Sequence, residues 1–217
     1  MSSLKISPSL LSADFSRLAE EIEKVEKDSD FFHVDVMDGH FVPNLTIGPI
    51  IVQAIHSLTK VPLDVHLMIS DPEKYLEAFA KAGSHILTIH VEATKEKTPE
   101  VLDRIRSLDL KAGLALSPNT PLSVAKDCFS KADMVLLMTV HPGFGGQKFI
   151  PDVLPKVEAL RKDYTGDIEV DGGINDQTGR EAVRKGATIL VAGHYVFRSE
   201  DPQGAIRKLR QCHEFSR

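Results

Sequence analysis

Short apolar runs alternate with longer amphipathic segments along the whole chain. The runs are rich in Val, Ile and Leu and lie at residues 4–10, 31–36, 61–67, 85–91, 110–116, 134–140, 167–170 and 188–191. Between them, apolar side chains recur every three or four residues, which is the spacing of a helix with one buried face. The pattern therefore predicts eight strands that alternate with helices, and hence a parallel sheet.

A chain of 217 residues accommodates eight such repeats most economically as a closed (β/α)8 TIM barrel. We expect residues 1–217 to form this barrel as a single domain. An open, doubly wound sheet is the alternative, but it would need fewer strands and would normally carry a glycine-rich dinucleotide-binding turn after the first one. Here the first strand is followed by Ser9, Leu10, Leu11 and Ser12, so the barrel is favoured.

The composition is that of a globular protein and argues against several classes of partner. Apolar residues make up 42% of the chain, and 26 Lys and Arg against 31 Asp and Glu give a net charge of -5. There is no basic excess for nucleic acid or a membrane surface, and no apolar stretch is long enough to cross a bilayer. Residues 1–6 lack the layout of a signal peptide. Because Cys128 and Cys212 form no paired motif, we expect a cytoplasmic protein with two free thiols.

Ionisable side chains gather at the expected C-terminal ends of the strands, where a barrel of this kind carries its active site. They end the second, third, fourth and seventh strands: His33, Asp35, His66, His90, Glu92 and Asp171. A single barrel histidine is most simply a hydrogen-bonded core residue. Two histidines and two aspartates on one face instead require pairing or a metal. Imidazoles together with carboxylates suit Zn²⁺, Mn²⁺ or Fe²⁺, and the spacing does not choose between these ions.

Three methionines lie beside these positions, namely Met37, Met68 and Met138. Methionine is most often a core filler, and that is the simpler interpretation of each one taken alone. Met37 and Met68, however, each follow an ionisable strand residue by two positions and therefore share its face of the strand. We predict that these methionines form an apolar cap that excludes water from the site.

Glycines form a second cluster, after the last three strands. Gly143, Gly145 and Gly146 lie in a loop with Phe144 after the sixth strand, and the seventh and eighth strands are followed by Gly172, Gly173 and Gly193. Glycine lets the backbone approach an anion closely, and loops after strands seven and eight commonly bind phosphate in this architecture. One such turn is weak support, but three on consecutive strands predict a phosphate site. No Lys or Arg lies inside these turns, so backbone amides and helix dipoles would hold the phosphate.

A divalent metal, two carboxylates and a phosphate site suggest one kind of chemistry. A metal that bridges a carbonyl and the neighbouring hydroxyl stabilises an enediolate as a Lewis acid. Two carboxylates on opposite faces of that intermediate can remove a proton on one side and return it on the other. Asp35 and Asp171, on strands from opposite walls, suit such an inversion next to a carbonyl.

Several segments resemble the ribulose-phosphate 3-epimerase family, in order from residue 7 to about residue 197. They include residues 7–11, 33–44, 64–68, 90–92, 138–140, 142–147 and 171–173, of which 35–44 is the most specific. The resemblance implies a (β/α)8 barrel that interconverts D-ribulose 5-phosphate and D-xylulose 5-phosphate in the pentose phosphate pathway. It also implies Zn²⁺ as the favoured metal, with Mn²⁺, Fe²⁺ or Co²⁺ as alternatives.

The resemblance implies a role for each matching residue. The metal ligands would be His33, Asp35, His66 and Asp171, of which Asp35 and Asp171 would also be the acid/base pair. The cap over the intermediate would be Met37, Met68 and Met138. The substrate would be held by Ser9, His66, Gly143, Phe144, Gly145, Gly146, Asp171, Gly172, Gly173 and Gly193. We expect His194, which follows Gly193 but does not match the family, to contact the substrate as well.

Three positions depart from the family pattern: His141 and Ser117 stand where Asn is usual, and His194 stands where Ser is usual. His141 and His194 flank the expected phosphate loops, where a protonated imidazole would strengthen phosphate binding at acidic pH. Neutral drift in a loop that binds through its main chain is the alternative. If the histidines reshape the pocket, a six-carbon ketose phosphate such as D-allulose 6-phosphate becomes a candidate substrate.

Other functions remain open at this point. Decarboxylases and aldolase-like barrels of the orotidine-phosphate or hexulose-phosphate type need a lysine where this chain has Asp35, Val36, Met37 and Asp38, which argues against them. A barrel that binds a sugar phosphate without turnover is a further alternative, but binding alone does not call for a carboxylate on each face. Oligomers are common among such barrels, so a homo-oligomer is possible, although no helix face is apolar enough to identify an interface.

Overall fold

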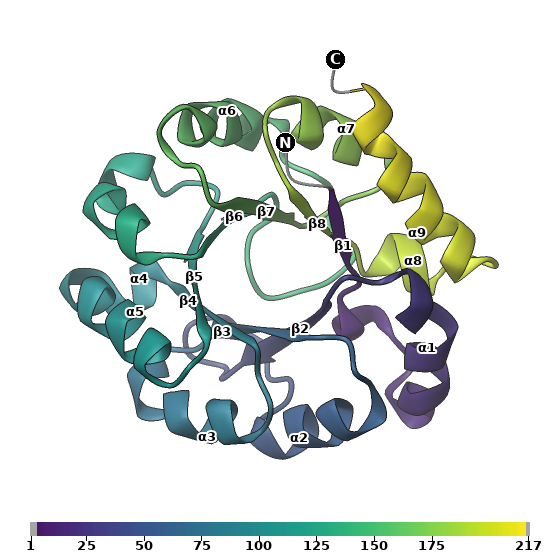
Figure 1. Cartoon of the computed structure of the whole chain (residues 1–217), viewed down its shortest axis with the longest axis horizontal. Helices are drawn as coiled ribbons and strands as arrows, with labels where there is room; N and C mark the ends of the chain where they lie inside the picture. The colour runs from purple at the N-terminus through teal and green to yellow at the C-terminus, as the bar shows by residue number, and fades with distance from the viewer. Residues whose placement is uncertain (1–3, 216–217) are drawn as a thin grey trace.

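The computed structural model describes residues 4–215, in which eight strands form a ring surrounded by helices (Figure 1). The strands are β1 (Lys5–Ser7), β2 (Phe32–Met37), β3 (Leu63–Met68), β4 (Ile86–His90), β5 (Lys111–Leu116), β6 (Met134–Met138), β7 (Asp167–Asp171) and β8 (Ile189–Val191). All neighbours in the order β1-β8-β7-β6-β5-β4-β3-β2 are parallel. The expected strands are confirmed, with ends that differ by a few residues.

The ring closes between β1 and β2 through residues just beyond the end of β1. Ser9 forms a parallel bridge with His33, and the backbone N–H of His33 donates to the carbonyl of Pro8 at 3.0 Å. Because β1 also pairs with β8, neither end of the sheet is a free edge. The closed barrel is therefore confirmed, and the open sheet is excluded.

Helices cover the outside of the ring. They are α1 (Leu18–Val25), α2 (Pro49–Leu58), α3 (Leu76–Lys81), α4 (Val91–Thr94), α5 (Thr98–Ser107), α6 (Leu154–Asp163), α7 (Asp176–Arg184), α8 (His194–Phe197) and α9 (Pro202–Arg210). The connection from β5 to β6 consists of the 3-10 turns η6 (Leu122–Val124) and η7 (Lys126–Lys131) instead of an α-helix. Further 3-10 turns adjoin several of the helices, as η8 (Pro151–Val153) does before α6.

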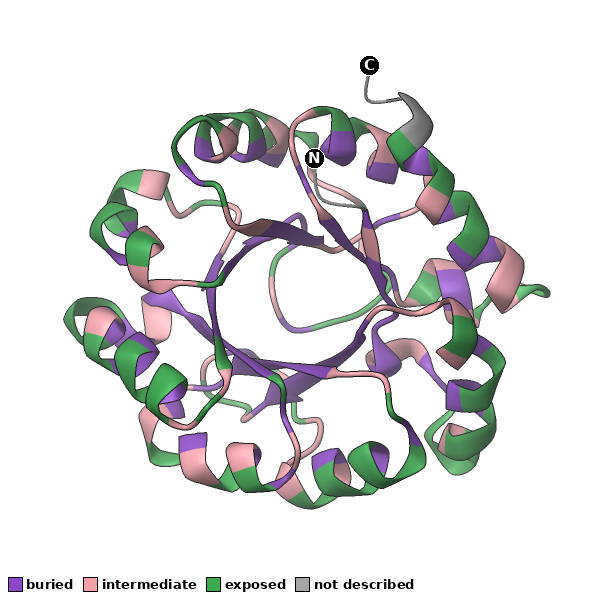
Figure 2. Cartoon of the chain, viewed as in Figure 1, coloured by how far each residue is buried: buried purple, intermediate pink, exposed green. Residues whose placement is uncertain are grey.

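The core is a shell of apolar side chains between the strands and the helices. Figure 2 shows buried residues along the strands and on the inward sides of the helices. In α1, for example, Ile22 and Val25 are almost completely buried while the opposite face is exposed. The interior of the ring is different, because it contains buried polar side chains such as His33, Asp64 and Glu169. Buried polar groups need partners, and these partners shape the site.

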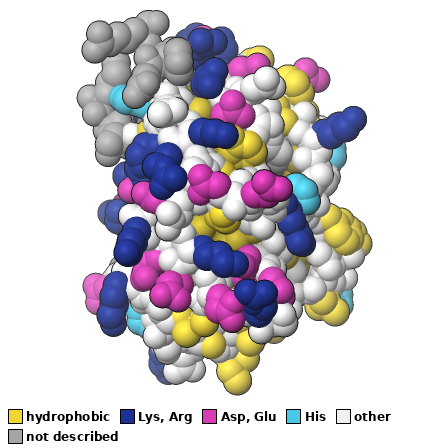
Figure 3. Space-filling model, turned by 90° about the vertical axis from the view of Figure 1, so that its right-hand side faces the viewer, with side chains coloured by type: hydrophobic (Ala, Val, Ile, Leu, Met, Phe, Trp, Pro, Cys, Tyr) yellow, Lys and Arg dark blue, Asp and Glu magenta, His cyan; other side chains and the backbone are white. Residues whose placement is uncertain are grey.

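The outer surface carries charges of both signs. Figure 3 shows Lys and Arg interspersed with Asp and Glu on the side of the barrel formed by α1, α8 and α9, without a large patch of one sign on that side. No helix within residues 4–215 is long and apolar enough to span a membrane.

Candidate active site

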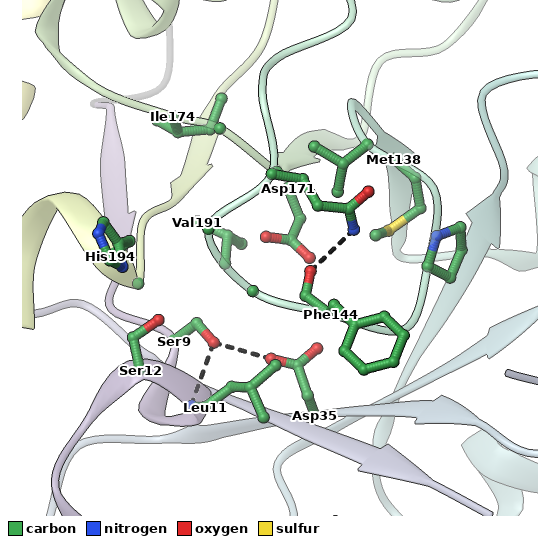
Figure 4. A pocket seen from close by; sticks show the side chains of 18 of the residues that line it. Ser9, Leu11, Ser12, Asp35, Met138, Phe144, Asp171, Ile174, Val191 and His194 are labelled. Atoms are coloured by element: carbon green, nitrogen blue, oxygen red, sulfur yellow. Dashed lines mark hydrogen bonds between the residues drawn. The ribbon is translucent and has the colours of Figure 1, made fainter. Parts of the chain in front are cut away.

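A pocket of about 450 Å³ lies at the C-terminal ends of the strands (Figure 4). Most of the predicted site residues line it: Ser9, Asp35, Met37, Met68, Met138, Gly143, Phe144, Gly145, Gly146, Asp171, Gly172, Gly173, Gly193 and His194. The two predicted metal-binding histidines, His33 and His66, are fully buried against Asp35. The structure therefore brings the predicted site residues together around one cavity.

The four predicted metal ligands have donor atoms close enough to share one ion. One donor atom of each of His33, Asp35, His66 and Asp171 lies within 4.8 Å of the others. Nε2 of His33 is 3.2 Å from Nδ1 of His66 and 3.9 Å from Oδ2 of Asp171, while Nδ1 of His66 is 3.2 Å from Oδ1 of Asp35. Ligands about 2.0–2.2 Å from a tetrahedral ion are themselves about 3.4 Å apart. The donor types and their separations therefore fit a divalent cation.

His33 is oriented by a carboxylate on the side away from the pocket. Its Nδ1 lies 2.7 Å from Oδ2 of Asp64, whose Oδ1 accepts a hydrogen bond from the Thr88 hydroxyl at 3.0 Å. Because an ionised carboxylate only accepts, Nδ1 of His33 carries the hydrogen of this bond. Nε2 of His33 is thereby directed toward Asp35 and Asp171. Metal-ligating histidines are commonly supported in this way.

Glu169 lies beneath this pair and is completely buried. Burial and the neighbouring Asp64 carboxylate raise the pKa of Glu169 well above its ordinary value. Neither side-chain oxygen of Glu169 has a hydrogen-bond partner among the described residues, and its Oε1 lies 3.9 Å from Nδ1 of His33. His33, Asp64 and Glu169 also form a second group of potential metal ligands, but protonation of Glu169 explains this cluster without a second ion.

The two predicted acid/base residues have different electrostatic environments. Burial opposes ionisation of Asp35, but the adjacent His33 outweighs it and lowers the pKa of Asp35 far below its ordinary value. Burial and repulsion from Asp35 raise the pKa of Asp171 to about 7. Asp35 is therefore an ionised carboxylate at neutral pH, whereas Asp171 readily holds a proton. Two carboxyl groups whose pKa values are shifted in opposite directions typically serve as the acid and the base of a reaction.

The environment of Asp35 depends on the closure of the barrel. The hydroxyl of Ser9 donates to Oδ2 of Asp35 at 2.7 Å, across the junction of β1 and β2 (Figure 4). Thr46 fixes the same strand by donating its hydroxyl to the carbonyl of Asp35 at 2.7 Å and accepting from the N–H of Met37 at 2.9 Å. The carboxylate of Asp35 is consequently held in one position at the floor of the pocket.

The predicted methionine cap has two parts. Met37 and Met68 belong to one buried apolar cluster with Val42, against which Leu11 and Phe41 pack. Met138 belongs instead to a cluster on the other side with Ala115, Leu136 and Val140. All three methionines line the pocket, so apolar side chains flank the carboxylates from both sides.

Three glycine-rich loops form the rim of the pocket. Gly143, Gly146, Gly172 and Gly173 have positive φ angles, which other residues rarely adopt. A Cβ atom on Gly173 would lie 2.4 Å from the backbone nitrogen of Phe149, so the loops after β6 and β7 are packed too closely for a side chain there. The loop after β2 also contacts the loop after β6, because the side-chain N–H of Asn44 donates to the carbonyl of Gly143 at 2.7 Å.

Several pocket residues were not predicted from the sequence, including Ser12, Lys148, Asn175, Thr178 and Tyr195. The turns themselves contain no Lys or Arg, as expected, but Lys148 directly follows the loop after β6 and supplies a cation at its edge. Asn175 and Thr178 form a capping box at the start of α7. Their spacing, immediately after Gly172 and Gly173, is the sequence signal that could have identified them.

The chain matches the model of the "Ribulose-phosphate 3 epimerase family" over residues 5–197. It is 50% identical to the ribulose-phosphate 3-epimerase of Bacillus subtilis over 214 residues, which cover 95% of this chain and 98% of that protein. It is 51% identical to the enzyme of the same name from Synechocystis over 212 residues, covering 94% and 92% of the two chains. Similarity at this level extends over the whole barrel and includes every strand that contributes to the pocket.

Solved structures of other barrels share the fold at low sequence identity. 3-Hexulose-6-phosphate synthase from Salmonella typhimurium superposes with a TM-score of 0.76 at 18% identity, covering 99% of this chain and 100% of that one. KGPDC from Streptococcus mutans superposes with a TM-score of 0.77 at 15% identity, covering 97% of each chain. These two likenesses support the fold alone, whereas the family match and the close relatives show that the chain belongs to the ribulose-phosphate 3-epimerase family.

Proposed function

We propose that this protein is a metal-dependent epimerase that inverts C3 of D-ribulose 5-phosphate to give D-xylulose 5-phosphate. The observation that carries the proposal is the pair Asp35 and Asp171, which face one pocket with pKa values displaced in opposite directions. Inversion requires a base on one face of the substrate and an acid on the other. Membership of the epimerase family supports this assignment.

The two carboxyl groups divide the proton transfers between them. Asp35, ionised and held by Ser9 at 2.7 Å, accepts the C3 proton from one face of the sugar. Asp171, which reaches the same pocket from β7, delivers a proton to the opposite face. In the reverse direction the roles exchange, because each carboxyl group then starts in the other protonation state. The methionines exclude water that would otherwise compete for these protons.

His33, Asp35, His66 and Asp171 would hold the metal ion. When bound, a divalent ion supplies Lewis-acid stabilisation of the negative charge that develops on the substrate oxygens. The resemblance to the family favours Zn²⁺, and Mn²⁺, Fe²⁺ and Co²⁺ are alternatives, because two imidazoles with two carboxylates suit several divalent ions. The acid/base roles of Asp35 and Asp171 require that both side chains stay accessible to the substrate, as their position in the pocket lining allows.

The phosphate group would lie against the glycine-rich rim. Backbone N–H groups of the loops around Gly145, Gly172 and Gly193 can approach an anion closely, because no Cβ atom stands in the way. His194 and Lys148 border the same part of the pocket and add side chains that can carry positive charge. We expect the enzyme to act in the cytoplasm, where the similarly named rice relative is described as the cytoplasmic isoform, and within the pentose phosphate pathway.

The test is turnover of D-ribulose 5-phosphate in D₂O, with deuterium at C3 and D-xylulose 5-phosphate measured together. Protein stripped with a chelator is compared with protein supplied with Zn²⁺, Mn²⁺, Fe²⁺ or Co²⁺. We expect metal-dependent formation of product that carries deuterium at C3. Absence of both exchange and product would contradict the proposal, and D-allulose 6-phosphate would then test the six-carbon alternative. Binding of either sugar phosphate without exchange would instead support a barrel without catalytic activity.

A further inference from the structure

His66 is supported from behind by hydrogen bonds that run away from the pocket. Its Nε2 lies 2.9 Å from Nε2 of His90, and Nδ1 of His90 lies 3.0 Å from Oε2 of Glu92. The two imidazole rings are stacked with centroids 5.0 Å apart, and both histidines are fully buried. A hydrogen bond between two neutral imidazoles fixes proton positions, because one nitrogen must donate and the other must accept.

Glu92 sets the direction of these hydrogen bonds. Its Oε1 accepts from the backbone N–H of Ser117 at 2.7 Å and from the hydroxyl of Thr120, while its Oε2 faces Nδ1 of His90. A carboxylate that takes donors on both oxygens acts only as an acceptor. Nδ1 of His90 therefore carries the hydrogen, and Nε2 of His90 accepts from Nε2–H of His66. Nδ1 of His66 is left unprotonated, 3.2 Å from Nε2 of His33 and on the side of the proposed metal site.

The segment that holds Glu92 is itself anchored to a helix. The ammonium group of Lys156, on α6, donates to the carbonyl oxygens of Ser117 at 3.1 Å, Pro118 at 2.7 Å and Thr120 at 2.7 Å. Lys156 is half-buried, and these carbonyl groups occupy its donors. The loop after β5 is thereby fixed in the conformation that presents its N–H and hydroxyl groups to Glu92.

We propose that His90 and Glu92 are positioning residues that fix the tautomer of His66, so that its Nδ1 lone pair faces the metal ion. We call the hydrogen-bonded set of His66, His90 and Glu92 the imidazole relay. This inference rests on the metal site proposed above. His90 ends β4 as expected from the sequence, whereas Glu92, expected on the same strand, lies in α4. The relay gives both residues a role although neither lines the pocket. It also explains how the two metal-binding histidines differ, since His33 is held directly by the carboxylate of Asp64 whereas His66 is held through a second imidazole.

The isosteric change Glu92→Gln gives the sharpest test. Glutamine has one acceptor oxygen, and Ser117 and Thr120 present two donors to the same side of residue 92. The oxygen should turn toward those donors, which leaves the amide N–H₂ facing His90. Nδ1 of His90 must then accept, Nε2 of His90 donates to His66, and the hydrogen of His66 moves to Nδ1, where it blocks the metal. The substitution therefore reverses the direction of the hydrogen bonds in the relay without changing the size of the side chain at position 92.

Three further variants separate this effect from simple loss of packing. His90→Leu removes the acceptor for Nε2–H of His66. His90→Gln keeps a side-chain oxygen that can accept the same hydrogen, and so should restore the Zn²⁺ affinity that His90→Leu loses. His56→Gln is the matched control, because His56 is an exposed histidine on α2 that contacts only the ring of His85 among the aromatic residues described in the structure. All variants are compared with wild type for thermal unfolding before metal is measured.

Two readouts are needed. Zn²⁺ affinity of the full chain is measured by competition with a chromophoric chelator, and the imidazole ¹⁵N shifts of His66 are measured in metal-free protein. We expect wild-type His66 to carry its hydrogen on Nε2, and Glu92→Gln to carry it on Nδ1. We expect Glu92→Gln and His90→Leu to weaken Zn²⁺ binding by about 10–100-fold, with His90→Gln closer to wild type and His56→Gln unchanged.

Two results would overturn the relay. Wild-type His66 protonated on Nδ1 would contradict the proposed tautomer, and Glu92→Gln with wild-type Zn²⁺ affinity and an unchanged His66 tautomer would contradict the role of Glu92. In both cases metal-dependent turnover by wild type would leave the proposed function intact. Wild-type protein that binds no divalent ion would instead remove the metal site, and with it the relay.

Discussion

Asp35 at β2 and Asp171 at β7 face one pocket, and their pKa values are displaced in opposite directions. Burial raises the pKa of both groups, but His33 lies closer to Asp35 than to Asp171: its Nε2 is 3.4 Å from Oδ1 of Asp35 and 3.9 Å from Oδ2 of Asp171. One carboxyl group is thereby kept ionised, and its charge raises the proton affinity of the other. The functional prediction is that the two groups act on opposite faces of the substrate.

Replacing either carboxyl group should separate proton exchange from inversion. In Asp35→Asn and Asp171→Asn, one face of the substrate loses its acid/base group, so epimerisation should fall by at least about 10²–10⁴-fold. The remaining carboxylate can still exchange the C3 proton of one epimer with solvent. We expect each variant to wash deuterium into only one of the two pentulose phosphates, with the opposite epimer in the two variants. Near-wild-type turnover in either variant would remove that residue from the mechanism.

The raised pKa of Asp171 predicts a pH dependence of stability in protein freed of metal. The folded state binds this proton more tightly than the unfolded state, because the pKa is about 7 in the fold against a model value of 3.8. The stabilisation is therefore fully present below the unfolded pKa and is lost as pH rises toward 7. The three-unit shift sets an upper limit of about 4 kcal/mol for this loss.

Asp171→Asn has no such proton and isolates the effect. Urea unfolding of both proteins, between about pH 4 and pH 7 with chelator present, measures the difference in their free energies of unfolding. We expect the variant to gain stability relative to wild type as pH rises. A difference that stays constant with pH would show that Asp171 has an ordinary pKa in the folded protein.

His194 should contribute to phosphate binding. It is exposed at the pocket rim and lies next to Gly146 of the loop after β6, so its imidazole can approach the phosphate. We expect His194→Ser to raise KM for the sugar phosphate, measured beside wild type at one fixed pH. A KM equal to that of wild type would support binding through the main chain alone.

Gly172 should tolerate no side chain, because its φ of +118° is unfavourable for other residues and a Cβ would lie 2.4 Å from Cγ2 of Val140. Gly172→Ala should therefore shift the loop after β7, raise KM for the sugar phosphate and lower stability by more than about 1 kcal/mol. Gly48→Ala is the control, since a Cβ there meets nothing within 4 Å and φ is -134°. Equal KM and stability in the two variants would show that the loop accommodates the added methyl group.

Local sequence signals predicted the elements better than their ends. In the sequence, four residues precede a proline in the pattern of a helix N-cap, namely Asp71, Thr98, Thr120 and Asp201. Asp201 does accept a hydrogen bond from the backbone N–H of Gly204 at the start of α9. Asp71 makes no side-chain capping bond, Thr98 lies inside α5, and Thr120 instead donates to Glu92. Thr120 was misassigned because its partner lies on another strand–helix unit, which local sequence does not show. Glycine often ends a helix because it adopts positive φ easily, and Gly83 and Gly186 do have positive φ angles after α3 and α7.

The sequence by itself determined the barrel and the end of it that carries the site. Alternation of apolar runs with helical spacing sets the order of elements, and a period of two places His33 and Asp35 on one face of β2. Their roles stay predictions until they are tested. Only the tertiary structure decided which polar groups meet: Ser9 reaches Asp35 because the ring closes there, and Glu92 controls His66 through His90. Those contacts depend on the register between strands and on buried hydrogen bonds between distant residues, which no local pattern in the sequence encodes.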